Sequence, residues 1–254
     1  MLLLFILVSS NCFLFLIIDQ FASLKSLTIP YKTKLGANTF REIAKACPHL
    51  ESIDIGFTFR SGINPKDHDL MEAVERFPNL NSISVDMWYA TSMGVASMAR
   101  AMGGQLFHLK ISDSSITRRY LSDEAMRAIG SSCKNLKSFA FELVYYQKYY
   151  QESMLFDCLT DAGIVALVDG CRRLETLSLS DARKVTKNAF VTILDMIEQS
   201  NAASADGTSN KGFALRKINL KGYSFVIRGS PLRIVDNDPW AGNPFGVYSF
   251  RSDD

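Results

Sequence analysis

Residues 159–179 read Leu159-Thr-Asp-Ala-Gly-Ile-Val-Ala-Leu-Val-Asp-Gly-Cys-Arg-Arg-Leu-Glu-Thr-Leu-Ser-Leu179, and this stretch decides the fold. Its first half places Ile164, Leu167 and Val168 at helical spacing, so they share one face of a helix. Its second half alternates apolar and polar residues up to Leu179, which is typical of a strand with one buried side. A short helix that runs into a short strand is therefore one unit, and weaker copies of it recur before and after.

The strand part of this unit occurs seven times, with the pattern apolar-x-x-apolar-x-apolar. The seven strand cores are Leu24-Leu27-Ile29, Leu50-Ile53-Ile55, Leu80-Ile83-Val85, Leu106-Leu109-Ile111, Leu136-Phe139-Phe141, Leu174-Leu177-Leu179 and Leu215-Ile218-Leu220. Their first residues are 26 to 41 positions apart, and the two longest intervals come last. A recurrence in this range is the signature of a stacked repeat array, and the longer intervals indicate insertions.

Helical segments are expected between the strand cores, over roughly 39–47, 69–77, 92–102, 122–133, 160–171 and 186–200. Hydroxyl residues open three of them, namely Ser122, Thr160 and Thr186. A side-chain oxygen at this position accepts a hydrogen bond from the free N–H groups of the first turn, so these residues predict helix starts.

No single unit can bury both its apolar strand edge and its apolar helix stripe, so neighbouring units must stack around a continuous core. The sequence therefore predicts an α/β solenoid of horseshoe shape, with a parallel sheet on the concave face and helices on the convex face. The repeat array is expected over residues 22–228, with insertions at 142–158 and 201–214, and an irregular tail follows over 229–254. Residues 201–210 are poor in apolar side chains and are expected to be disordered.

Three motifs carry a resemblance to a known family: Cys47-Pro-His-Leu50, Cys133-Lys-Asn-Leu136 and Cys171-Arg-Arg-Leu174. With the helix openings at Leu121-Ser-Asp and Leu159-Thr-Asp, they resemble the cysteine-containing leucine-rich repeats of F-box/LRR proteins, over about residues 24–220. The resemblance implies a leucine-rich-repeat solenoid and substrate recognition in an SCF-type ubiquitin ligase pathway. No segment of the sequence resembles an F-box, so the ligase role is implied by the repeats alone.

The first 21 residues form an apolar segment with three interpretations. Residues 11–21 could be the helix of an incomplete first repeat, because Leu14, Ile18 and Phe21 align with the apolar positions of a later helix. Residues 1–18 could instead be a signal peptide or membrane anchor, although no Lys or Arg precedes the apolar run and no clear cleavage site follows. The third interpretation is an error in the gene structure.

Charge and cysteine content narrow the class of protein. The net charge is +2 and no long run of one sign occurs, which argues against a dedicated nucleic-acid surface. The five cysteines are an odd number, and three of them occupy the same place in three repeats. Reduced, buried thiols in a reducing compartment fit this pattern better than a disulfide framework, so a cytoplasmic location is expected.

The sequence offers no recognisable catalytic or metal site. Cys47, Cys133 and Cys171 are interpreted as small buried side chains that pack against the next repeat, and no C-x-x-C pair supports zinc. His49 and His108, like the third histidine in the chain, belong to no recognisable nucleophilic arrangement. We therefore expect a protein that is not an enzyme and uses no cofactor.

Aromatic residues mark the strand-to-helix side of the predicted array. The insertion at 142–158 carries four tyrosines, and the corresponding loops of earlier repeats add further rings; together these are Tyr145, Tyr146, Tyr149, Tyr150, Phe57, Phe59, Trp88 and Tyr89. Tyrosine combines a large rigid area with a polar tip, which suits interfaces. The alternative is that the insertion's rings only cover the edge of the sheet.

The outward-facing strand positions complete the candidate partner surface: Asp54, Ser84, Lys110, Ala140, Ser178 and Asn219. These side chains are mostly short and of mixed charge, which suits a protein or peptide partner better than a nucleic acid. The expected function is a non-catalytic protein–protein interaction module, with ubiquitin-ligase subunits as candidate partners. The alternative is an extracellular or membrane-tethered leucine-rich-repeat binding protein.

Overall fold

A computed structural model describes residues 3–5, 22–29, 37–55, 67–87, 90–113, 121–143, 159–180, 184–205, 212–221 and 233–236 of the 254-residue chain. Nine strands form one parallel sheet in which spatial order follows sequence order. The strands are β1 (Leu3–Phe5), β2 (Ser26–Ile29), β3 (Ser52–Ile55), β4 (Ser82–Asp86), β5 (His108–Asp113), β6 (Ser138–Leu143), β7 (Thr176–Ser180), β8 (Lys217–Lys221) and β9 (Arg233–Asp236). Each pairs in parallel with the next.

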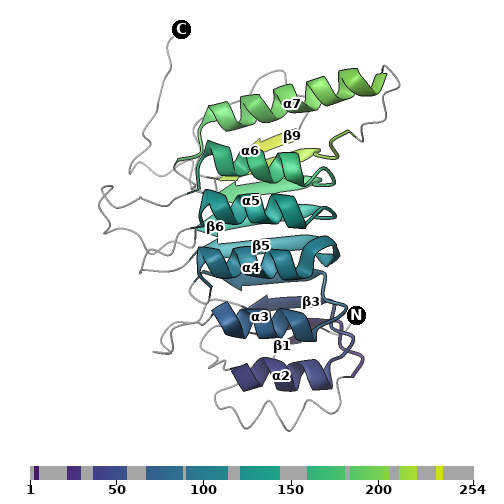
Figure 1. The fold of residues 1–254 in the computed structure, drawn as a ribbon. Helices are drawn as coiled ribbons and strands as arrows, with labels where there is room; N and C mark the ends of the chain where they lie inside the picture. The colour runs from purple at the N-terminus through teal and green to yellow at the C-terminus, as the bar shows by residue number, and fades with distance from the viewer. Residues whose placement is uncertain are drawn as a thin grey trace, which may run out of the picture.

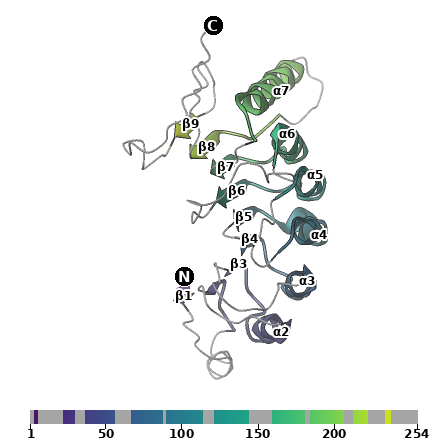
Figure 2. The ribbon, with the colours of Figure 1, turned by 90° about the vertical axis from the view of Figure 1, so that its left-hand side faces the viewer.

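The helices stack beside the sheet in the same order (Figure 1). They are α2 (Ala37–Ala46), α3 (Asp67–Arg76), α4 (Ser92–Met102), α5 (Asp123–Ser132), α6 (Asp161–Gly170) and α7 (Lys187–Ala205), and the short η2 (Gly103–Gln105) follows α4. Figure 2 shows the strands along the inner side and the helices along the outer side of a curved array. The predicted α/β solenoid, with its sheet on the concave face, is confirmed.

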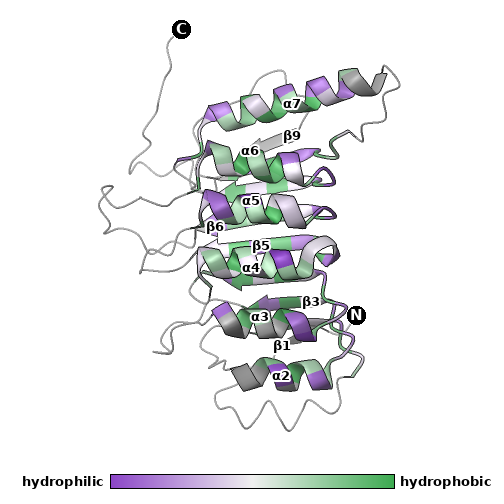
Figure 3. Ribbon diagram, in the orientation of Figure 1, coloured by the Kyte–Doolittle hydropathy of each residue, from purple (hydrophilic) through white to green (hydrophobic). Residues whose placement is uncertain are grey.

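The core lies between the sheet and the helices, and the sequence pattern located it. No residue of the seven predicted strand cores is more than 5% exposed. The register places Ile83, Leu109 and Phe139 side by side on three consecutive strands, and the row continues in both directions. The helices close the core with one face, and Figure 3 shows polar and apolar residues sharing each of them. Burial of this continuous apolar layer is the main favourable term in folding.

The expected capping residues Ser122, Thr160 and Thr186 each accept a backbone N–H of the first helical turn through the side-chain oxygen. Thr91, which the sequence analysis did not name, caps α4 in the same way. One expectation is corrected at the other end of the array. The prediction of disorder from residue 201 is wrong for its first part, because α7 continues through Ala205. Three alanines lie in this stretch, and alanine is the strongest helix former, so helix propensity favours this extension.

Two strands extend the sheet beyond the seven predicted cores. β1 pairs with β2 and places Leu4 beside Leu27. β9 pairs with β8 and places Ile234 beside Ile218. β1 lies in the predicted N-terminal apolar segment, and β9 lies in the predicted C-terminal tail. In both segments the repeat pattern is too short to predict a strand.

Polar links join the helix starts of consecutive repeats. The first residue of α3 is Asp67, and its two carboxylate oxygens accept from the backbone N–H and the hydroxyl of Thr91. Asp123 and Asp161 make the same pair of bonds to Thr160 and Thr186. At the junction of α4 and α5, serine hydroxyls of α4 and of the α5 cap meet instead. These hydrogen bonds fix the start of one helix relative to the start of the next.

Among the described residues, none of the helices has both the length and the apolar character required to cross a lipid bilayer.

Candidate functional site: the concave face of the sheet

On the concave face, two rows of solvent-facing side chains run across the strands. The first row starts the strands and contains Ser26, Ser52, Ser82, His108, Ser138, Thr176 and Lys217. The second row lies two residues further along and contains Thr28, Asp54, Ser84, Lys110, Ala140, Ser178 and Asn219. The structure thus places the predicted residues Asp54, Ser84 and Lys110 on three adjacent strands in one row. Their role in binding stays a prediction.

Hydroxyl side chains make up most of the first row and three of the seven positions of the second row. The serines and threonines of these rows are half-buried, because each lies between neighbours on the adjacent strands. Short polar side chains leave the backbone of the sheet close to the solvent and keep hydrogen-bonding groups within reach of a partner. The face is therefore polar, with Ala140 as the one apolar side chain in the two rows.

The long side chains of β5 interrupt this surface. His108 and Lys110 are both exposed, whereas their row neighbours on β4 and β6 are short and half-buried. The Lys110 Nζ lies 2.9 Å from a carboxylate oxygen of Glu142 on β6, and both side chains are nearly half exposed. An ion pair at such exposure contributes at most about 1 kcal/mol. Its main consequence is local, because the pair cancels the charge in the middle of the face.

One buried carboxylate was missed by the sequence analysis. Asp86 ends β4 and is fully buried, and its Oδ2 accepts a hydrogen bond of 2.8 Å from the hydroxyl of Ser112 on β5. The sequence carried no signal for this burial, because Val85, Asp86 and the buried Met87 continue the apolar–polar alternation, which predicts a solvent-facing Asp86. A buried carboxylate needs such partners because it cannot rely on water.

The last two repeats contain an amide with one unpartnered end. Asn219 on β8 donates from Nδ2 to the hydroxyl oxygen of Ser178 on β7 at 2.8 Å. Its other polar atom, Oδ1, is buried and accepts no hydrogen bond. Buried polar atoms in native proteins nearly always have a partner, so this atom marks a place where a donor is missing.

The predicted aromatic rim falls outside the described residues. This holds for all eight of its members: Phe57, Phe59, Trp88, Tyr89, Tyr145, Tyr146, Tyr149 and Tyr150. Their part in partner binding stays a prediction.

The helix-end cysteines are buried and unpaired, as the sequence analysis expected for Cys47, Cys133 and Cys171. Burial raises the pKa of Cys133 and of Cys171 to about 12, and it raises the pKa of Cys47 as well. Their hydrogen bonds add a contact that the sequence analysis did not predict. The thiols of Cys133 and Cys171 donate to carbonyl oxygens of the preceding repeat, at 3.5 Å to Ala99 and at 3.3 Å to Cys133. A neutral buried thiol is inert, so these residues serve packing.

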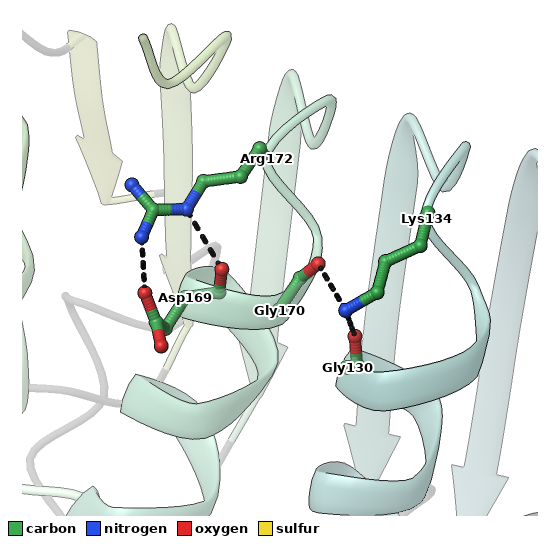
Figure 4. A network of polar contacts seen from close by, with 5 residues as sticks. All are labelled: Gly130, Lys134, Asp169, Gly170 and Arg172. Carbon is green, nitrogen blue, oxygen red and sulfur yellow. Dashed lines mark hydrogen bonds and ion pairs between the residues drawn. The ribbon is translucent and has the colours of Figure 1, made fainter. Parts of the chain in front are cut away.

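Cations close the turns between the helix ends and the strands (Figure 4). Lys134 donates to the terminal carbonyls of two helices, at 2.8 Å to Gly130 and at 3.2 Å to Gly170. Arg172 donates to the carbonyl and the carboxylate of Asp169, and it lies 3.9 Å from the centre of the Phe213 ring. Positive charge at a helix C-terminus is favourable, so these residues are accounted for by stability.

No metal site emerges from the described part of the chain, where no three His, Cys, Asp or Glu side chains gather closely enough to hold an ion. His49 and His108 are exposed and lie in different repeats.

No protein-family model matches the chain, and no curated protein matches it either. Among solved structures, a crystal structure of a TLR13–ssRNA13 complex is similar with a TM-score of 0.49 and 15% sequence identity. The alignment covers 83% of this chain but only 27% of that one, so this chain spans about a quarter of its length. The crystal structure of the yeast Rad7–Elc1 complex aligns at 16% identity and a TM-score of 0.29, covering 84% of this chain and 80% of that one. At such values the fold assignment depends on the strand order and register described above.

Proposed function

We propose that this protein is a non-catalytic recognition module that binds a protein partner on the concave face of its sheet. One observation carries the proposal. Every described helix lies on the outer side of the array, so none of them covers the two polar rows (Figure 2). A repeat array fixes such rows over a long, curved surface, which suits an extended partner.

Within this proposal, the partner is the substrate of an SCF-type ubiquitin ligase, and the chain works in the cytoplasm. The cysteine-containing repeat motifs support this, because they resemble the repeats of F-box/LRR proteins. The three described thiols also support it, because free, buried cysteines are typical of a reducing compartment. The contact to the ligase would come from another segment or another chain. The alternative is an extracellular or membrane-tethered binding protein, for which the apolar residues 1–18 are the supporting observation.

Proximity labelling of the tagged full-length chain tests the proposal. Ser84→Arg places a long cation in the middle of the concave row, whereas Thr192→Arg makes the same kind of change on the exposed side of α7. We expect cullin–ligase subunits and a target protein to be labelled by the wild type and by Thr192→Arg, with the target lost in Ser84→Arg.

Two other outcomes contradict parts of the proposal. Equal labelling of the target by both arginine variants would exclude the concave face as the binding surface. Labelling of secretory-pathway proteins in place of ligase subunits would favour the extracellular alternative. A further variant with Tyr145, Tyr146, Tyr149 and Tyr150 changed to Ala tests the aromatic rim separately.

A further inference from the structure

Cations gather on the rim of the array where the helices end and the strands begin, in the three repeats that contain β6, β7 and β8. Each of these repeats contributes two of them, in the order Lys134, Lys137, Arg172, Arg173, Arg216 and Lys217. Lys134 and Arg172 are bound to helix ends, so stability accounts for both. We refer to the other four as the basic rim.

The four cations of the basic rim have no carboxylate partner among the ion pairs of the described residues. Lys137, Arg173 and Arg216 are exposed, and Lys217 is half-buried. The Lys137 Nζ lies 5.7 Å from the centre of the Phe107 ring. Arg173 donates to a side-chain amide oxygen of the preceding repeat at 2.8 Å. A guanidinium has several further N–H groups, so most of the donors on this rim remain available to a partner.

A single carboxylate, that of Glu175, lies among these cations. The backbone N–H of Glu175 donates to the carbonyl of Lys137, and the N–H of Arg216 donates to the carbonyl of Glu175, so the three residues lie side by side on consecutive repeats. The same positions at the other end of the array hold Lys25 and Glu51, whose side chains pair at 2.7 Å and cancel. Four cations against one carboxylate leave an excess of positive charge at the C-terminal end only.

We propose that the basic rim binds an acidic peptide segment of a partner through Asp or Glu side chains. Lys137 and Arg216 are two strand separations apart, which is about 10 Å. An extended chain covers this distance in about three residues, so two acidic residues with two others between them match both cations. Arginine also binds a carboxylate through two parallel N–H bonds, which suits Arg173 and Arg216.

Glu175 favours a peptide over a nucleic acid. A nucleic acid carries a phosphate at every nucleotide, so a strand along the basic rim would bring negative charge against Glu175. A peptide can place an uncharged residue at this point, between its two acidic residues. The inference goes beyond the proposed function, because three of the four cations lie outside the two rows of the concave face.

Fluorescence anisotropy of a labelled peptide on the full-length protein tests the proposal. The probe consists of four Glu-Gly-Ser repeats, which place a carboxylate at every third residue, and four Gln-Gly-Ser repeats form the uncharged control peptide. The double variant Lys137→Gln/Arg216→Gln removes two cations of the basic rim. Its matched control is Arg127→Gln/Lys187→Gln, which removes the same charge from exposed positions on α5 and α7.

We expect the acidic probe to bind the wild type and the matched control equally, and to bind Lys137→Gln/Arg216→Gln about fivefold more weakly. Binding should weaken as salt is added, and the uncharged peptide should not bind. Glu175→Gln should tighten binding about threefold, because it removes the one repulsive charge. A gain in affinity cannot come from loss of folding, so this variant separates binding from stability.

Three outcomes would overturn the proposal. The first is an equal loss of binding in the two double variants, because attraction would then follow net charge and not the basic rim. The second is tighter binding of a thymidine dodecanucleotide, or of mixed phosphatidylcholine–phosphatidylserine vesicles, that is lost in Lys137→Gln/Arg216→Gln. The third is failure of the acidic probe to bind the wild type. The proposed function would stand in each case, because its test is Ser84→Arg on the concave face.

Discussion

Asp123 holds the backbone N–H of Thr160 with one carboxylate oxygen and the Thr160 hydroxyl with the other. The two bonds are 2.8 and 2.6 Å long. Thr160 is also the residue that caps α6, because its Oγ1 accepts from the backbone N–H of Ala162. The first residue of one helix therefore fixes the capping residue of the next helix. Similar links recur along the array, so helix capping and repeat stacking form one cooperative system.

Loss of the Asp123 carboxylate should destabilise the fold. Asp123→Ala removes both hydrogen bonds to Thr160, and bonds to a charged acceptor contribute about 1.5–3 kcal/mol each in favourable cases. We expect a loss of about 2–4 kcal/mol in the free energy of unfolding, measured by urea titration. Glu124→Ala is the control, because Glu124 is the exposed next residue of the same turn and should change stability by less than about 0.5 kcal/mol. Equal effects of the two substitutions would contradict the structural link.

A glycine makes room for this carboxylate, and the two positions should be coupled. A Cβ added to Gly163 would lie 2.3 Å from the Asp123 Oδ1, so Gly163→Ala should destabilise. At the serine junction, Ala125 occupies the corresponding position of α5 opposite Ser92. Asp123→Ser should therefore relieve the clash. In a double-mutant cycle we expect the two changes together to cost at least about 1 kcal/mol less than their sum, and additive effects would refute the coupling.

Gly170 should be intolerant of a side chain although it ends a helix. A Cβ on Gly170 would lie 2.2 Å from the carbonyl oxygen of Gly130, because α5 and α6 approach closely at these residues. Gly→Ala in a helix ordinarily stabilises by up to about 1 kcal/mol, so destabilisation by Gly170→Ala would be a reversal of sign. Gly212→Ala is the control, because its nearest neighbour would be 3.5 Å away. Thermal unfolding of both variants measures the difference.

The buried thiols should be unreactive in the folded protein. Cys133 and Cys171 are at most 1% exposed, and only the thiolate reacts with alkylating agents. We expect iodoacetamide at pH 8 to leave both unmodified until urea unfolds the chain, as read by peptide mass spectrometry. Modification of either residue before the unfolding transition would show that its repeat opens locally.

The same thiols should make stability fall at alkaline pH. Burial raises the pKa of Cys133 and Cys171 from the ordinary value of 9.0 to about 12. Between these values the unfolded chain releases the protons while the folded chain keeps them, so stability is full below about pH 9 and declines from there toward pH 12. Replacing both residues with Ala should flatten this decline relative to each protein's own stability at pH 7. An unchanged slope would assign the alkaline loss to other groups.

The repeat pattern predicted the seven central strands because each strand buries the same three apolar positions. The spacing of these three positions can be recognised within each repeat. It placed Asp54, Ser84 and Lys110 on one face for the same reason, since alternate residues of a strand point the same way. The repeat pattern did not predict the outer strands β1 and β9. Strands this short become recognisable only when they pair with β2 and β8. The sequence analysis placed the end of α7 too early because it relied on the low hydrophobicity of this stretch, whereas the helix propensity of its alanines favours a longer helix.

By itself the sequence determined the solenoid, since an apolar strand edge and an apolar helix stripe that recur together can be buried only by stacking. Only the tertiary structure decided which polar groups meet between repeats. The link from Asp123 to Thr160 and the hydrogen bond from the Asn219 amide to Ser178 join residues roughly forty positions apart. The chain does not encode such distances as a local pattern, because they follow from the register that the stacked core imposes on neighbouring strands and helices.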